Sequence, residues 1–215
     1  EEEKSIKGLN QCMNERIDPK NPKMFGVSLK KMSRTSNLKL LNFDKKDSLE
    51  KEFSDFSMNY DSIDTYLNFS DGTRIQFRSF GGANVLTGWQ GEVKGTKANQ
   101  GKISLGPINL LLKMHGISQI DTTYARQIKS DPGKISDYVV SGLEKYATGF
   151  TEEKFAKLVI DKTKKKQFDS WLYSKVHCIA ITETITSIRD SDKQKQVCED
   201  LYLYANSRSS LSAPY

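Results

Sequence analysis

Two short motifs place a lysine two residues after a polar partner, and this spacing puts both side chains on one face of a β-strand. Glu92 and Lys94 form the first, within "GWQGEVKGTKANQGK", and Ser28 and Lys30 form the second, within "FGVSLKKM". A carboxylate beside a lysine suits metal-dependent phosphodiester hydrolysis, in which hard oxygen ligands bind Mg²⁺ or Mn²⁺ and the lysine lies near the attacking water. A solvated strand face with a weak Glu–Lys pair has the same pattern, so both interpretations stay open.

The stretch "TRIQFRSF" alternates in the same way, with Ile75 and Phe77 on one side of the predicted strand and polar residues on the other. If this strand pairs with the strand of Glu92, one face of the sheet is apolar and the other is lined by Arg74, Gln76, Arg78, Glu92 and Lys94. The glycine-flanked loop that follows adds Lys97 and Lys102. Its backbone N–H groups and lysines suit phosphate binding, although a plain basic loop is the equal alternative.

Charge and composition favour a folded protein with a polyanionic partner. The 215 residues carry a formal net charge of +6, which favours contact with nucleic acid. The three cysteines form no Cys-x-x-Cys or His-x-Cys pattern, so the sequence predicts a reducing compartment and neither a disulfide framework nor a structural zinc site. No apolar run approaches the roughly 20 residues of a membrane span, so we expect no membrane partner.

The first part of the chain is dominated by alternating patterns. Alternation of apolar and polar residues predicts strands over residues 24–32, 62–69, 73–80 and 89–95. Asp71 and Gly72, between two of these segments, are a strong signal for a β-hairpin turn. The stretch over residues 33–56 is ambiguous: it fits either a helix through Phe53 and Phe56 or a short strand.

After residue 101 the periodicity becomes helical. Helices are predicted over residues 107–115, 135–146, from 151 onward, 168–188 and 193–204. Strands first and helices after predict an α+β fold, with an antiparallel or mixed sheet in the N-terminal half and a helical C-terminal half. We expect a sheet-containing core in residues 1–118 and a helical part in 119–215 that packs on it as one structural domain. His115 and His177 lie on apolar helices, and we expect both to be structural.

Three stretches together resemble uncharacterised proteins of large tailed bacteriophages, which are similar to diverged PD-(D/E)xK nucleases. They are "FGVSLKKM", the run from "IQFRSFGG" to "WQGEVKGTKANQGKI", and "LYLYANSRSSLSAPY". The resemblance implies that Lys30 takes the place of the active-site lysine and Ser28 that of a Glu or Gln. The upstream aspartate strand of that family has no counterpart here. Asp18 lies 12 residues before Lys30, but "RIDPKNP" is typical of a loop.

The resemblance implies a phage protein that processes nucleic acid, acting as a Mg²⁺- or Mn²⁺-dependent nuclease in the host cytoplasm or packaged in the virion, with other phage proteins as partners. Lys30, Glu92 and Lys94 would be catalytic, and Asp18 and Glu92 would bind the metal. The nucleic acid would contact Arg74, Arg78, Lys97 and Lys102. The alternative is a non-catalytic protein, either structural in the virion or binding nucleic acid or a host factor through the same basic face.

Overall fold

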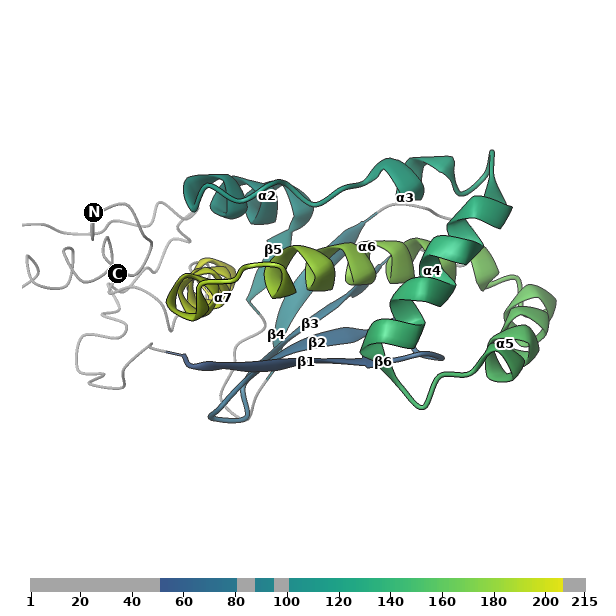
Figure 1. Ribbon diagram of the computed structural model, residues 1–215, viewed down its shortest axis with the longest axis horizontal. Helices are drawn as coiled ribbons and strands as arrows, with labels where there is room; N and C mark the ends of the chain where they lie inside the picture. The colour runs from purple at the N-terminus through teal and green to yellow at the C-terminus, as the bar shows by residue number, and fades with distance from the viewer. Residues whose placement is uncertain (1–50, 81–87, 95–100, 207–215) are drawn as a thin grey trace, which may run out of the picture.

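In a computed structural model, the described residues are 51–80, 88–94 and 101–206. They form one mixed sheet with the strand order β5-β4-β3-β2-β1-β6, packed by helices (Figure 1). The strands are β1 (Phe53–Asn59), β2 (Thr65–Phe69), β3 (Arg74–Ser79), β4 (Trp89–Lys94), β5 (Lys102–Ser104) and β6 (Ala147–Thr148). The helices are α2 (Leu105–Met114), α3 (Thr123–Gln127), α4 (Pro132–Tyr146), α5 (Glu152–Lys164), α6 (Phe168–Thr186) and α7 (Ser191–Asn206). The predicted α+β class is confirmed, with the sheet largely in the N-terminal half and the helices in the C-terminal half.

Strands β1 to β5 form an antiparallel meander, and β6 joins its edge parallel to β1. The predicted hairpin connects β2 and β3. Gly72 has a φ of 80° there, a conformation that glycine adopts without steric cost, and the Asp71 carboxylate accepts a hydrogen bond from the Thr73 N–H at 3.0 Å. The turn chemistry in the sequence therefore sets the register of the central strands.

The described end of the stretch that was ambiguous between helix and strand belongs to strand β1 (Phe53–Asn59), so a helix through Phe53 and Phe56 is wrong; residues 33–50 lie outside the described residues. The register shifts between Phe53 and Asp55, which indicates a β-bulge or a similar irregularity. Phe53 then pairs with Phe69 and Phe56 pairs with Leu67, so both phenylalanines lie on the same side of the sheet. The extra residue gives these two aromatic residues a spacing of three, which imitates helical periodicity.

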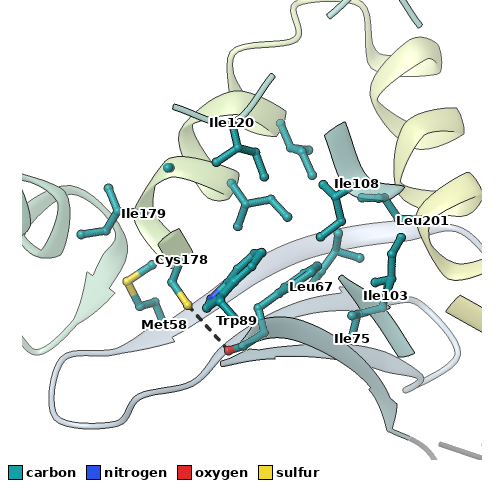
Figure 2. Packing of buried hydrophobic residues seen from close by; sticks show 14 of the residues in the cluster. Met58, Leu67, Ile75, Trp89, Ile103, Ile108, Ile120, Cys178, Ile179 and Leu201 are labelled. Atoms are coloured by element: carbon teal, nitrogen blue, oxygen red, sulfur yellow. Dashed lines mark hydrogen bonds between the residues drawn. The ribbon is translucent and has the colours of Figure 1, made fainter. Parts of the chain in front are cut away.

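One hydrophobic core joins the sheet to the helices, and it contains residues from both predicted parts of the chain. Leu67, Ile75 and Val93 lie in one row across β2, β3 and β4 and are fully buried. Helix α6 packs on β3, and α7 packs on β1, β4 and β5. Figure 2 shows the apolar side chains of the strands, including Leu67, Ile75 and Ile103, directed at those of the helices. The helices therefore cover the apolar face of the sheet.

The helix boundaries follow local signals in the sequence. The Thr151 side chain accepts a hydrogen bond from the Lys154 N–H at 3.3 Å and caps α5, whose last turn contains Lys162 and Lys164 next to the negative end of the helix dipole. Gly116, with a φ of 65°, follows the end of α2 as predicted. Within residues 51–80, 88–94 and 101–206, no helix combines the length and the apolar character needed to cross a bilayer.

Candidate functional site

The second face of the sheet carries polar side chains in transverse rows. One row across β1 to β5 consists of Ser57, Tyr66, Gln76, Glu92 and Lys102. The next row consists of Asp55, Asn68, Arg74 and Lys94. Arg78 and Gln90 pair one step further along, and Phe80 follows with the same alternation. We call these residues the polar face; the helices lie on the other side of the sheet (Figure 1).

Glu92 is the central carboxylate of the polar face, and two lysines hold it. Its Oε2 lies 2.8 Å from the Lys94 Nζ and its Oε1 lies 3.2 Å from the Lys102 Nζ. The Glu92 side chain is 11% exposed, whereas Lys94 and Lys102 are 35% and 55% exposed. Burial raises the pKa of Glu92, but the hydrogen bonds and charges of the two lysines outweigh burial and lower the pKa below its ordinary value. Glu92 is therefore ionised at neutral pH and orients both ammonium groups.

Positive charge predominates around this carboxylate. Arg74, Arg78, Lys94 and Lys102 lie on three adjacent strands or at their ends, against the single carboxylate of Glu92. The other acidic residue of the polar face, Asp55, lies on β1, three strands from Lys94 and about 14 Å away at the usual strand spacing. Its carboxylate accepts a hydrogen bond from Asn68 at 2.8 Å. The part of the polar face on β3 to β5 thus has a net positive charge.

Two aromatic rings lie among these cations. The guanidinium carbon of Arg74 lies 4.4 Å from the centroid of the Tyr66 ring, and Gln76 donates a hydrogen bond to the Tyr66 hydroxyl at 3.3 Å. The guanidinium carbon of Arg78 lies 4.7 Å from the centroid of the Phe80 ring. These distances are within the range of cation–π attraction. The polar face therefore alternates between positive charge and aromatic surface.

The structure brings together most of the residues predicted to contact nucleic acid or to act in catalysis. Glu92 and Lys94 share a strand face, as their spacing predicted, and Gln76 lies directly opposite Glu92. Arg74, Arg78 and Lys102 lie on the same face. The predicted strand over residues 24–32 and the residues Ser28, Lys30, Asp18 and Lys97 lie outside the described residues.

Sequence reasoning missed the aromatic residues of this face. Phe80 follows Arg74, Gln76 and Arg78 in the same alternation, so the period that identified the basic residues also contained it. Tyr66 was recognisable in the same way, because it alternates with Thr65 and Leu67 in "TYLNF" and shares its side of the strand with Asn68. Both were overlooked because aromatic residues in a strand more often belong to the core.

Among the described residues, the surroundings of Glu92 do not suit a divalent cation. Mg²⁺ and Mn²⁺ require several oxygen ligands, and two ammonium groups already occupy the two oxygens of this carboxylate. In the part of the chain that the structure describes, no group of three or more histidine, cysteine or acidic side chains is arranged to hold a metal ion. The described residues of the polar face are thus suited to bind anions.

A buried lysine on α6 provides a second unusual charge. Lys175 is fully buried, and its ammonium group donates hydrogen bonds to the backbone carbonyls of Asn59 and Asp64, on either side of the loop between β1 and β2. Burial lowers the pKa of Lys175 to about 8. The carbonyl partners belong to the loop backbone, so Lys175 anchors this loop to the helix.

Both histidines have structural partners, in agreement with the prediction. The His115 Nε2 lies 2.8 Å from the Oδ2 of the buried Asp200, which joins α2 to α7. The His177 Nδ1 lies 2.9 Å from the Tyr173 carbonyl one turn earlier, and its ring stacks on Trp89 with centroids 5.3 Å apart. Each imidazole thus joins or braces elements of the fold.

An open hollow between α4 and α5 has the opposite charge. It has a volume of about 490 Å³ and is lined by Asp137, Val140, Ser141, Glu144, Glu152 and Phe155. Three carboxylates line it, so it repels the polyanion that the net charge of the chain favours. Between these two regions, the polar face is the better candidate for a polyanion.

The fold and this face define an α+β protein with one sheet, covered by helices on its apolar side and basic on the other. Comparisons with protein-family models, with curated proteins and with solved structures find no match to the chain. The geometry of the polar face is therefore the feature from which a function can be inferred.

Proposed function

We propose that this protein binds nucleic acid through the polar face of its sheet and does not cut it. The observation that supports the proposal is the group of four cations on β3 to β5, which outnumber the single carboxylate among them. Each cation held near a phosphate releases condensed counterions, so a cluster of this kind supplies affinity that does not depend on base sequence.

The ion pairs of Glu92 favour binding over cleavage. A nuclease uses such a carboxylate to hold a cation, whereas Glu92 holds Lys94 at 2.8 Å and Lys102 at 3.2 Å. The nuclease hypothesis itself stays a prediction, because Lys30 and Asp18 lie outside the described residues. The predicted phage partners and localisation likewise stay predictions.

The test compares cations of the polar face with cations elsewhere. Fluorescence anisotropy would measure the affinity for a labelled 12-nucleotide oligonucleotide in EDTA. The Arg74→Gln/Lys94→Gln variant is compared with Lys157→Gln/Lys165→Gln, whose lysines form exposed pairs on or at the end of α5. Each lost phosphate contact reduces the slope of log affinity against log salt by about 0.7, so Arg74→Gln/Lys94→Gln reduces it by about 1.4. Relative to 1 M salt, this variant should therefore bind about 25-fold more weakly than the wild type at 0.1 M salt.

The control variant should bind within about twofold of the wild type, because its lysines lie outside the polar face. Equal weakening of both variants would show that only overall charge matters, and an unaffected face variant would refute the proposal. A parallel incubation with Mg²⁺ or Mn²⁺, followed by gel analysis of the oligonucleotide, tests for cleavage directly. Cleavage by the wild type would overturn the non-catalytic part of the proposal.

A further inference from the structure

Phe80 is an exposed aromatic residue on a face that is otherwise polar. Its side chain is 37% exposed, and among the described residues the other exposed large hydrophobic side chains are Leu110, Met114 and Ile160, all on helices. More than a third of the surface of this phenylalanine thus stays in contact with solvent. Its ring is therefore available to a ligand that also suits the surrounding positive charge.

The surroundings of the ring match the chemistry of a nucleotide. The Arg78 guanidinium carbon lies 4.7 Å and the Lys102 ammonium nitrogen 5.8 Å from the centroid of the Phe80 ring. One aromatic surface and two cations are thus close enough to serve a base and its neighbouring phosphates together. Stacking of bases on aromatic rings with added cation–π attraction from arginine is the general mode of binding for single strands.

The backbone holds this ring on an ordered part of the sheet. The Phe80 N–H donates to the Gly88 carbonyl at 3.0 Å, which continues the pairing of β3 with β4 by one residue. The preceding residue, Ser79, donates its N–H to the Ser174 hydroxyl of α6 at 3.1 Å. Ser79 is itself buried between the strand and the helix. Phe80 is therefore pre-positioned, and little conformational entropy is lost when it stacks on a base.

We infer that the polar face selects single-stranded nucleic acid, with Phe80 as the base-stacking residue and Arg78 and Lys102 as its phosphate contacts. The inference rests on the proposed function. In a duplex the bases are stacked on one another, so a duplex offers this face its phosphates and base edges but no base face on which Phe80 could stack. A single strand offers phosphates and an accessible base face together, and Tyr66 beside Arg74 provides a second ring on the same surface.

The experiment measures affinity for 12-nucleotide single strands of DNA and of RNA and for the duplex of the same DNA sequence, in EDTA. The variants are Phe80→Leu, which keeps an apolar side chain but removes the ring, and Phe80→Tyr, which keeps the ring. Leu110→Ala on α2 is the control, because Leu110 is an exposed apolar residue outside the polar face. Removing one base-stacking ring should weaken single-strand binding about 5- to 100-fold and leave duplex binding within about twofold.

We expect the wild type to prefer both single strands over the duplex, Phe80→Tyr to restore the affinity, and Leu110→Ala to change nothing. A 5-bromouracil-substituted strand should crosslink under ultraviolet light to the tryptic peptide of residues 79–94, which contains Phe80. This inference would be overturned, with the proposed function left intact, by the following result. The wild type binds single strands and duplex equally, Phe80→Leu changes neither affinity, and Arg74→Gln/Lys94→Gln weakens both. Binding to none of the three nucleic acids would overturn both.

Discussion

Replacing Glu92 with glutamine should tighten nucleic-acid binding, because the change releases two cations without removing any. Glutamine has nearly the same shape as glutamate but cannot form the ion pairs with Lys94 at 2.8 Å and Lys102 at 3.2 Å. Exposed pairs of this kind contribute about 0.2 to 1 kcal/mol each, and both lysines are partly exposed. For the two pairs together this is about 0.4 to 2 kcal/mol, so a phosphate that competes with this carboxylate gains roughly 2- to 30-fold in affinity once the carboxylate is neutral.

The same substitution should also change how steeply the affinity falls with salt concentration. The four cations of the polar face and Glu92 sum to a charge of +3, which becomes +4 in Glu92→Gln. At about −0.7 per neutralised phosphate, the slope of log affinity against log salt changes from about −2.1 to about −2.8. Between 50 and 200 mM salt, the affinity of the wild type should then fall about 20-fold and that of the variant about 50-fold.

Anisotropy titrations of a labelled single strand in EDTA at several salt concentrations would measure both quantities. Asp55→Asn is the matched control, because it removes a carboxylate of the same face that accepts a hydrogen bond from Asn68. Asp55 lies three strands or about 14 Å from Lys94 and four strands from Lys102, beyond the Debye length of about 10 Å at 0.1 M salt. Unchanged affinity and slope in Glu92→Gln would refute the reasoning. Weaker binding in EDTA would refute it as well, whereas loss of a metal-dependent cleavage activity, measured separately with Mg²⁺ or Mn²⁺, would assign Glu92 the role that the nuclease hypothesis gives it.

Two further predictions concern stability. Burial lowers the folded-state pKa of Lys175 to about 8, so between pH 8 and 10.5 the unfolded state binds a proton that the folded state does not, and this group makes the free energy of unfolding rise with pH. Urea unfolding at pH 8 and at pH 10.5 would measure the free energy of unfolding of the wild type relative to Lys175→Met. This difference should rise by up to about 3 kcal/mol between the two pH values, and a difference that stays constant would contradict the assigned burial of the Lys175 charge. Gly142→Ala should cost about 1 to 3 kcal/mol in the same assay, because an added Cβ would lie 2.6 Å from two side-chain atoms of Ile179 and push α4 away from α6. Gly106→Ala in α2, where nothing lies within 4 Å of an added Cβ, should instead stabilise the protein by about 0.5 to 1 kcal/mol, and equal effects of the two changes would refute the packing argument.

Much of the sheet was predictable because its signals are local. The alternation in "TRIQFRSF" and "WQGEVK" decides which side chains share a face, and Asp71 and Gly72 provide a turn that joins two strands in one register. The helices follow in the same way from caps such as Thr151 and stops such as Gly116. The short elements β5, α3 and β6 were not predicted, since segments of two to five residues contain too little of any period.

The sequence by itself determined that Glu92, Lys94 and their basic neighbours would share one polar strand face, because the direction of a side chain depends only on its place in the alternation. The tertiary structure decided which charged groups on that face pair with one another and which are buried. Glu92 becomes a buried anchor for two lysines only because β5 brings Lys102 beside β4. Lys175 is buried because the loop between β1 and β2, more than 100 residues earlier, presents its carbonyls to α6. The local period records side-chain direction, whereas burial and charge pairing depend on distant segments that only the folded chain brings together.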